Sequence, residues 1–93
     1  MSYRFESLDY PVTERRLNSY YAEFFPMARV NLRLHTHAGV EFIYVMHGIL
    51  SVHTNTEEHV LEAGDSIYFD ATIPHAYRRS GGRVCSAVVV TAL

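Results

Sequence analysis

The strongest signal in the chain is a series of short segments in which apolar and polar residues alternate, each followed by turn residues. A period of two places successive side chains on opposite faces of a β-strand, so each segment offers one face to a core and one to solvent. The first such segment, residues 28–34, alternates three apolar with three polar residues: Val30, Leu32 and Leu34 with Arg29, Asn31 and Arg33. Six further strands are predicted at residues 41–46, 49–54, 58–61, 66–69, 76–78 and 84–91.

Turn residues separate these segments, and helical periodicity is almost absent. The turns are predicted at Ala38-Gly39, His47-Gly48, Asn55-Thr56, Ala63-Gly64-Asp65 and Ser80-Gly81-Gly82. Asp65 and Asp70 are expected to hydrogen-bond the backbone of turns, which is the usual role of aspartate at such positions. Short strands separated by frequent turns predict an all-β fold, an antiparallel sandwich or small barrel.

Residues 1–27 follow a different pattern and are predicted to form an N-terminal arm, with the β-rich domain at residues 28–93. Two prolines, Pro11 and Pro26, favour extended backbone in the residue before each of them. Between them, residues 13–17 could form a short helix capped by Thr13. An extended arm is the alternative, because the aromatic residues within 20–25 favour strands and need to be covered. A second subunit would cover them, and we therefore expect a homodimer.

Composition narrows the possible functions. The 93 residues are 48% hydrophobic and 19% charged, the balance of one globular domain. The formal net charge is −2 and all eight basic residues are arginine, so we expect no direct binding of nucleic acid. No stretch approaches the roughly 20 apolar residues that span a bilayer, and no secretory signal is recognisable, so a cytoplasmic protein without membrane contact is expected. The single Cys85 lies in an apolar run and is expected to be a buried, unreactive thiol.

Three histidines and one glutamate are spaced as metal ligands would be. His35 and His37 are two apart, so on a strand their imidazoles share a face. The Ala38-Gly39 break can turn the chain so that Glu41 approaches them, and His75 opens a later strand after a proline. Three imidazoles and a carboxylate suit one divalent transition metal ion, namely zinc, iron, manganese, nickel or cobalt, with open positions if the coordination is octahedral.

The order and spacing of these residues resemble the two motifs of the cupin superfamily. The first motif, G-x5-H-x-H-x3-E-x6-G, is matched from His35 to Gly48 with every interval correct, although Arg29 stands at the opening glycine. The second motif, G-x5-P-x-G-x2-H-x3-N, is matched at Gly64 and His75. Its proline, glycine and asparagine are replaced by Asp70, Thr72 and Arg79.

This resemblance covers about residues 28–92 and implies a jelly-roll β-barrel, also called a double-stranded β-helix. It also implies that the metal is held inside the barrel by His35, His37, Glu41 and His75. Segments 37–48, 61–70 and 73–79 further resemble the C-terminal sensor domain of helix-turn-helix regulators of the xenobiotic response element type. Those regulators carry DNA-binding helices upstream, and the present sequence shows none.

Residue parity indicates which side chains share the metal's face. Counting by twos from the four ligands gives candidate pocket residues: Arg33, Ile43, Val45 and Tyr77, with Asn31 and Arg79. Arg33 would anchor a carboxylate through its planar fork, and Tyr77 would add a hydroxyl; the alternative is that Arg33 and Arg79 are solvated rim residues. Val30, Leu32 and Leu34 would then point away from the histidines, which requires a bulge or a second buried face. The remaining histidines are expected to be solvated rather than metal-bound: His47, His53 and His59.

The leading hypothesis is a metal-containing cupin that senses a small anionic organic molecule. Its rival is a small metalloenzyme, an oxygenase if the metal is iron, or an isomerase or lyase if the metal acts as a Lewis acid. A third possibility is a storage or structural cupin without a bound ligand. The four metal ligands alone serve a sensor and an enzyme equally well, so the pocket decides between them.

Overall fold

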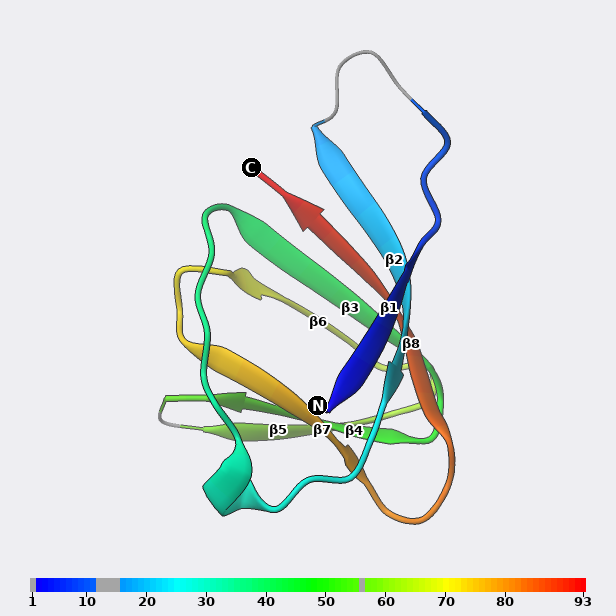
Figure 1. Ribbon diagram of the computed structural model, residues 1–93, viewed down its shortest axis with the longest axis vertical. Helices are drawn as coiled ribbons and strands as arrows, with labels where there is room; N and C mark the ends of the chain where they lie inside the picture. The colour runs from blue at the N-terminus through cyan, green and yellow to red at the C-terminus, as the bar shows by residue number, and fades with distance from the viewer. Residues whose placement is uncertain (1, 12–15, 56) are drawn as a thin grey trace.

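The computed structural model describes residues 2–11, 16–55 and 57–93 and arranges them in two antiparallel sheets (Figure 1). The larger sheet has the strand order β1-β2-β8-β3-β6 and the smaller has the order β5-β4-β7. The strands are β1 (Tyr3–Ser7), β2 (Leu17–Phe24), β3 (Val40–His47), β4 (Ile49–Thr54), β5 (Glu58–Glu62), β6 (Ser66–Asp70), β7 (His75–Ser80) and β8 (Cys85–Ala92). The expected all-β jelly-roll class is confirmed.

The strands predicted after residue 40 are confirmed, each within two residues at either end. The predicted turns explain this agreement, because they stop each strand locally; of the turn predicted at Asn55-Thr56, Thr56 lies outside the described residues. At Gly48, between β3 and β4, φ is +77° and an added Cβ would overlap the Val84 carbonyl oxygen, so this turn requires glycine. Asp65 and Asp70 take the expected turn roles, since their carboxylates accept the backbone N–H groups of Glu62 at 2.9 Å and Thr72 at 3.2 Å.

The N-terminal residues form strands of the larger sheet. β2 pairs along its whole length with β8 and on its other side with β1, so the chain itself covers the aromatic residues that point inward. Phe24 is 1% exposed, and Tyr20 packs against the core from the same face of β2. Of the helix predicted at 13–17, residues 13–15 lie outside the described residues, and Leu17 is the first residue of β2.

The strand predicted at residues 28–34 is wrong. Arg29–Asn31 form one turn of 3-10 helix, η1, closed by hydrogen bonds from Asn31 to Ala28 and from Leu32 to Arg29. Val30 is 88% exposed and Leu34 is 45% exposed, because no ladder partner covers this stretch. The conflict between the apolar residues and the histidines therefore disappears, since the two sets do not share a strand. No helix of the described residues has the length and apolar character to span a membrane.

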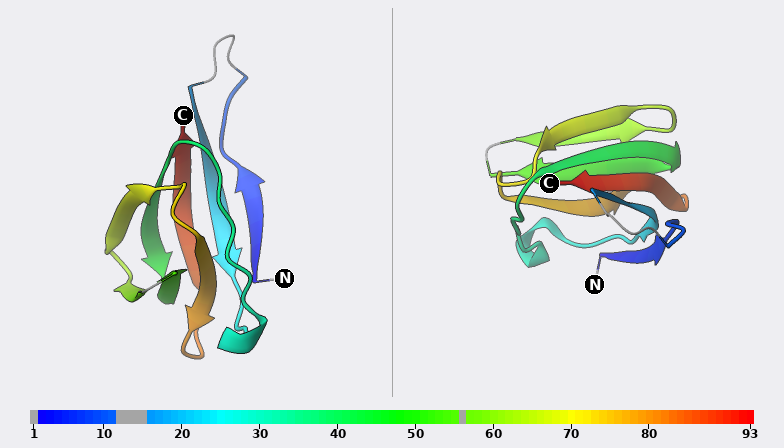
Figure 2. Two further views of the ribbon diagram at one scale, coloured as in Figure 1. Left: turned by 90° about the vertical axis from the view of Figure 1, so that its left-hand side faces the viewer. Right: turned by 90° about the horizontal axis from the view of Figure 1, so that it is seen from above.

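Residues 25–39, here called the β2–β3 segment, run along one side of the molecule between β7 and β1 (Figure 2). The segment is fixed at its start by a hydrogen bond from Arg79 N–H to the Phe25 carbonyl at 3.1 Å. An ion pair of 2.6 Å between Arg29 and Glu58 fixes its middle. It therefore closes the side of the barrel without forming a strand of either sheet.

The core lies between the two sheets and is built from the inward-facing residues of both. Its fully buried members are Ala22, Phe24, Ile43, Val45, Leu50, Val52, Tyr77, Cys85, Ala87 and Val89. The expectation of a buried thiol is confirmed, and burial raises the pKa of Cys85 to about 11 despite the opposing charge of Arg79. The thiol is therefore protonated at neutral pH and unreactive.

Candidate metal centre and adjoining cavity

Three backbone elements bring the sequence-predicted ligands together. Glu41 points inward from β3, which is held on both sides by β6 and β8. His75 begins β7, and the β2–β3 segment is tied to it by reciprocal backbone hydrogen bonds with His35 of 2.9 and 3.0 Å. A further backbone bond of 3.0 Å, from His37 to Ala71, completes the attachment. Main-chain contacts thus position all four side chains.

Gly39 makes the turn between His37 and Glu41 possible. Its φ is +89°, and an added Cβ would overlap the carbonyl oxygen of Ala92. Only glycine tolerates this conformation and this close approach of β8. The glycine of the predicted Ala38-Gly39 break therefore controls how the segment enters β3.

His37, Glu41 and His75 form a compact group of donor atoms. One ligand atom from each lies within 4.8 Å of the others. Nε2 of His37 is 3.0 Å from Oε1 of Glu41, and Nε2 of His75 is 3.9 Å from the same oxygen. Donors that share one ion at about 2.0–2.2 Å lie roughly 3.0–3.4 Å apart, so this group is close to the spacing that a metal site needs.

The hydrogen bonds around the group leave metal-binding atoms available. Nδ1 of His75 donates a hydrogen bond to the Ile73 carbonyl at 2.7 Å. The lone pair of the neutral ring is therefore on Nε2, which is available to bind a metal ion. That Nε2 and Oε2 of Glu41 are both buried without a hydrogen-bond partner. Buried polar atoms without partners are rare in proteins, and two on residues of one compact donor group fit a cation.

His35 lies beside this group rather than within it. Its ring centroid is 4.3 Å from that of His75 and 6.4 Å from that of His37. Burial lowers the pKa of His35, and the neighbouring His75 and His37 lower it further, against a backbone hydrogen bond at Arg33. The ring is therefore neutral at pH 7, the form in which imidazole binds metals.

Burial also dominates the electrostatics of Glu41, which is 3% exposed. The pKa of Glu41 is raised because the charged carboxylate loses its water, although the hydrogen bond from His37 and the charges of His75 and His37 act in the opposite direction. A cation at this point would stabilise the ionised carboxylate.

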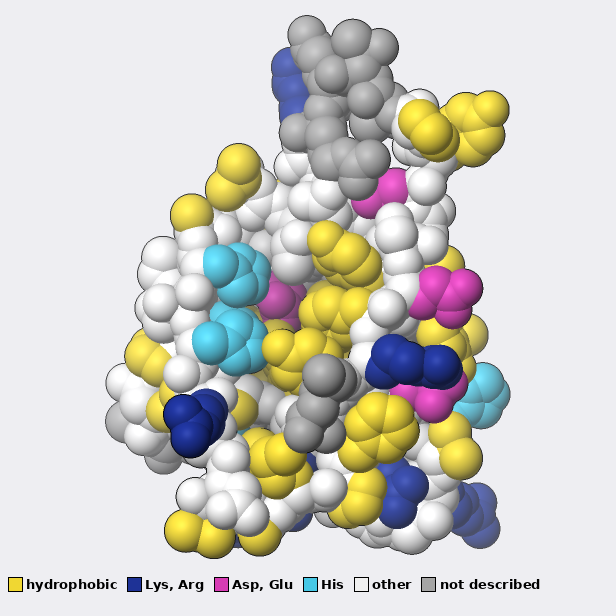
Figure 3. Space-filling model, viewed as in Figure 1, with side chains coloured by type: hydrophobic (Ala, Val, Ile, Leu, Met, Phe, Trp, Pro, Cys, Tyr) yellow, Lys and Arg dark blue, Asp and Glu magenta, His cyan; other side chains and the backbone are white. Residues whose placement is uncertain are grey.

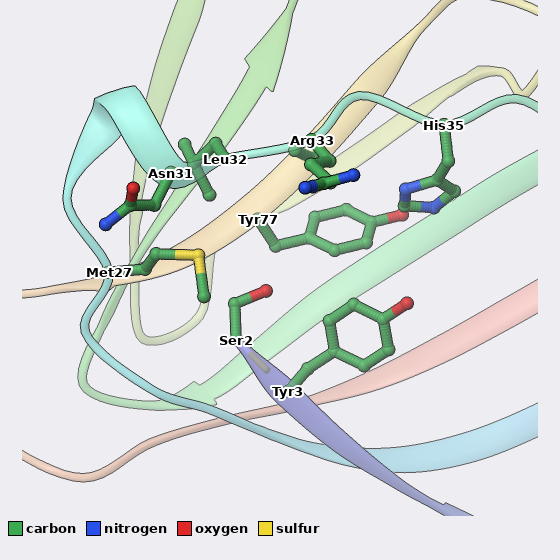
Figure 4. Close-up of a pocket in the computed structure, with 9 residues that line it drawn as sticks. Ser2, Tyr3, Met27, Asn31, Leu32, Arg33, His35 and Tyr77 are labelled. Carbon is green, nitrogen blue, oxygen red and sulfur yellow. The ribbon is translucent and has the colours of Figure 1, made fainter.

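A cavity of about 420 Å³ adjoins the histidines and opens between β1 and the β2–β3 segment. Its lining combines apolar and polar side chains: Ser2, Tyr3, Met27, Asn31, Leu32, Arg33, His35, Ala76 and Tyr77 (Figure 4). A second space of about 220 Å³ is lined by Phe5, Tyr20, His35, His37, Glu41, Tyr77 and Thr91. His35 and Tyr77 line both, so the two spaces adjoin. In Figure 3, histidine side chains border hydrophobic side chains at a hollow of the surface, with an acidic side chain recessed behind them.

The candidate pocket residues divide into two groups. Arg33 and Tyr77 line the larger cavity, as does Asn31. Ile43 and Val45 are instead fully buried in the core, at 0% solvent exposure, and line neither space. The N-terminal contributors, Tyr3 and Phe5 among them, were missed by sequence reasoning; their aromatic character was the available signal, but their position depends on the pairing of β1 with β2.

The other histidines have local partners. His47 contacts the Ser86 hydroxyl at 2.9 Å, and His59 contacts Glu57 at 3.1 Å. Nε2 of His53 accepts a hydrogen bond of 3.0 Å from Arg78. These three lie outside the group of donors around Glu41.

Comparisons with known proteins agree on the architecture. The profile of the cupin domain family matches residues 26–91. The Cupin_2 domain of an XRE family transcriptional regulator from Enterobacter cloacae superimposes with a TM-score of 0.83 at 21% identity, covering 100% of this chain and 98% of that one. No curated protein matches the chain.

Two longer proteins also match, and the chain spans about half the length of each. An HTH_3 family transcriptional regulator from Vibrio cholerae has a TM-score of 0.76 at 18% identity, with 99% of this chain and 52% of that one covered. HppE, solved with Co(II) and substrate, has a TM-score of 0.82 at 20% identity, with 97% and 52% covered. At these identities the likeness concerns the fold.

Proposed function

The chain belongs to the cupin domain family, and from this membership we propose that it is a metal-binding cupin domain that senses a small, negatively charged organic molecule. The observation that carries the proposal is the pair of buried, unpartnered donor atoms, Oε2 of Glu41 and Nε2 of His75. Leaving such atoms without partners costs about 1–3 kcal/mol each, which a bound cation offsets.

His37, Glu41 and His75 would hold the ion, with His35 as the fourth ligand. The donor set admits zinc, iron, manganese, nickel or cobalt. A bound ion would supply Lewis-acid character and open positions for an oxygen of the ligand. The protein's own part is to keep the His35 imidazole neutral, to hold the Glu41 carboxylate out of water and to fix the His75 ring through its hydrogen bond to the Ile73 carbonyl.

The position of Arg33 supports the proposal that the ligand is negatively charged. It lines the larger cavity, and among the described residues no acidic side chain pairs with it. Met27 and Leu32 add apolar surface to the same cavity. A cationic fork beside apolar walls suits a small carboxylate with a short hydrocarbon part.

The sensor role draws support from the two regulators that share the fold. A sensor domain needs to bind its ligand and release it unchanged, and the described site offers a cavity lined by the His35 imidazole. Contact with DNA would belong to other segments or chains, because the net charge of this one is −2. Regulators of transcription act in the cytoplasm of bacteria, which we propose as the compartment.

A metalloenzyme is the second candidate, and the three-residue group favours it. Two histidines and one carboxylate that face a common point are typical of non-haem Fe(II) oxygenases. HppE, which shares the fold, has been solved with Fe(II) and with Co(II) in the presence of substrates. An oxygenase therefore takes precedence over an isomerase or lyase among the enzyme alternatives.

We further propose that the domain forms a homodimer, through a different surface from the one that the sequence suggests. The outer face of the larger sheet carries neighbouring apolar side chains at registered positions: Phe42, Tyr44, Tyr68, Val88 and Val90. Tyr68 is 68% exposed and Tyr44 is 43% exposed. Two such faces can pack around a twofold axis. Light scattering should give twice the chain mass, and Tyr44→Glu with Tyr68→Glu should give the monomer; a monomeric native protein contradicts the proposal.

One experiment separates sensor from enzyme. Purified protein should carry close to one transition metal ion per chain by elemental analysis. Small carboxylates are then screened by thermal shift against the metal-loaded protein, and each hit is followed by mass spectrometry with and without oxygen. Unchanged recovery of the ligand supports the sensor. Product formation that requires His75 and the metal supports the enzyme, and metal-free native protein contradicts both.

A further inference from the structure

The hydroxyl of Tyr77 is a buried polar group without a partner. Tyr77 is 1% exposed, and its oxygen makes no hydrogen bond to any residue that the structure describes. Its ring is enclosed by other rings, with centroids 6.0 Å from Tyr3, 5.6 Å from Phe24 and 5.9 Å from His35. These contacts account for the ring but not for the hydroxyl, since phenylalanine would pack equally well. A buried hydroxyl that the fold leaves unpaired points to a partner outside the chain.

The position of this hydroxyl links the two spaces. Tyr77 lines the larger cavity together with Arg33, and the smaller one together with His37 and Glu41. Figure 4 shows the hydroxyl directed toward the ring of His35, with the Arg33 guanidinium lying on the same side of the cavity. A molecule that reaches from Arg33 to the metal donors would therefore lie beside Tyr77.

We propose that Tyr77 and Arg33 form a two-point recognition site for a short-chain hydroxycarboxylate. Arg33 pairs with the carboxylate, and the Tyr77 hydroxyl bonds to the ligand's hydroxyl oxygen beside the metal donors. This inference rests on the proposed function, because it takes the cavity as the ligand site, and it adds the ligand class and the residue that recognises it. A site that hydrogen-bonds a ligand hydroxyl discriminates strongly against the analogue without it.

The test uses the zinc-loaded chain, so that redox chemistry cannot consume the probes. The probes are the terminal hydroxy acids from glycolate to 5-hydroxypentanoate, each compared with the parent acid that lacks the hydroxyl. Calorimetry should show at least one hydroxy acid that binds the native protein more tightly than its parent acid does. In Tyr77→Phe that preference should disappear through a loss of about tenfold in affinity, while the parent acid binds as before.

Matched variants separate this role from a structural one. Tyr77→Phe should keep the zinc content and raise the melting temperature slightly, because it removes an unpaired buried hydroxyl. Tyr10→Phe, at a position that is 86% exposed and outside both sheets, should change neither the zinc content, nor the melting temperature, nor the preference. Arg33→Gln should weaken the hydroxy acid and the parent acid alike by about ten- to a hundredfold, and Arg83→Gln, in the exposed β7–β8 turn, should weaken neither.

The outcomes distinguish the inference from the function on which it rests. Carboxylates that bind with no preference for the hydroxyl, or a preference that Tyr77→Phe retains, overturn the inference and leave the metal-binding sensor standing. Failure of every probe to bind overturns the assigned ligand class. A protein that binds neither zinc nor any of the other candidate metal ions overturns both.

Discussion

Two glutamates in this small protein have histidine neighbours and opposite surroundings. Glu58, on the outer side of the smaller sheet, accepts hydrogen bonds from Ser51 at 2.9 Å, Arg29 at 2.6 Å and Arg78 at 3.1 Å. Glu41, inside the barrel, keeps one oxygen without any partner. The pKa of Glu58 is lowered, first by the Ser51 hydrogen bond, whereas burial raises the pKa of Glu41.

The difference separates a structural cluster from the candidate metal site. Around Glu58, the chain supplies enough donors, and the result is an attachment of the β2–β3 segment to β5. Around Glu41, the described residues supply histidine nitrogens, which can bind a metal ion, and no side chain with a permanent positive charge. The same residue types thus give a closed network in one region and an open one in the other.

The largest expected effect is on metal binding. His75→Ala and Glu41→Gln should each lower metal affinity by more than about a hundredfold, because each removes a donor from the group. His53→Ala and Glu58→Gln should retain the metal of the native protein. Elemental analysis after dialysis measures both pairs. Metal loss on substitution of Glu58 would erase the distinction between the two clusters.

The next effect concerns the turns beside the two glutamates' strands. Gly39 precedes β3 at φ +89° against the Ala92 carbonyl, and Gly64 follows β5 at φ +91° with no atom near its Cβ position. Gly39→Ala should lower the free energy of unfolding by about 3 kcal/mol or more and weaken metal binding, since strain and overlap combine. Gly64→Ala should cost only about 1–2 kcal/mol, for its backbone conformation alone. Urea denaturation of the two variants measures which substitution lowers the free energy of unfolding more. Equal losses in Gly39→Ala and Gly64→Ala would contradict the close packing at Gly39.

In metal-free protein, replacing each of the two glutamates by glutamine should change the free energy of unfolding in opposite directions. Glu41→Gln should raise the free energy of unfolding at pH 7 by about 1 kcal/mol, because it removes a buried charge. Glu58→Gln should lower it by about 1 kcal/mol, because it weakens the bonds to two arginines. Urea denaturation in the presence of a chelator measures both. A loss of stability in Glu41→Gln would mean that the carboxylate is satisfied without a cation.

The smallest expected effect is the pH dependence of the stability changes in Glu41→Gln and Glu58→Gln. The lowered pKa of Glu58 means that its contribution is present above the unfolded value of 4.5 and is lost as pH falls through the lower folded value. The raised pKa of Glu41 means that its ionisation penalty is absent below the unfolded value of 4.5 and develops as pH rises above it. The free energies of unfolding of Glu41→Gln and Glu58→Gln should therefore both approach that of the native protein as the pH falls from 7 to 3. Differences that persist at pH 3 would show that the substitutions act through packing instead.

Much of the fold could be predicted from local pattern, because each strand after residue 40 is bounded by its own turn. The alternation in residues 28–34 wrongly predicted a strand. A period of two indicates that a segment has two different faces, but it does not show that a neighbouring strand is available to pair with it. Where no ladder partner is available, η1 and the ion pair between Arg29 and Glu58 hold the chain instead. Likewise, the aromatics of β2 are covered by the chain's own sheet, which only long-range pairing decides.

For the site, the sequence by itself determined the donor types and their order along the chain, His35, His37, Glu41 and His75, because these follow from residue identity and short spacings. Tertiary structure alone decided that three of them form the tight group while His35 lies beside it. It also decided that Arg33 and Tyr77 line the cavity while Ile43 and Val45 are packed in the core. The physical reason is that a donor's identity is a property of one residue, whereas burial and a missing hydrogen-bond partner are properties of everything packed around it.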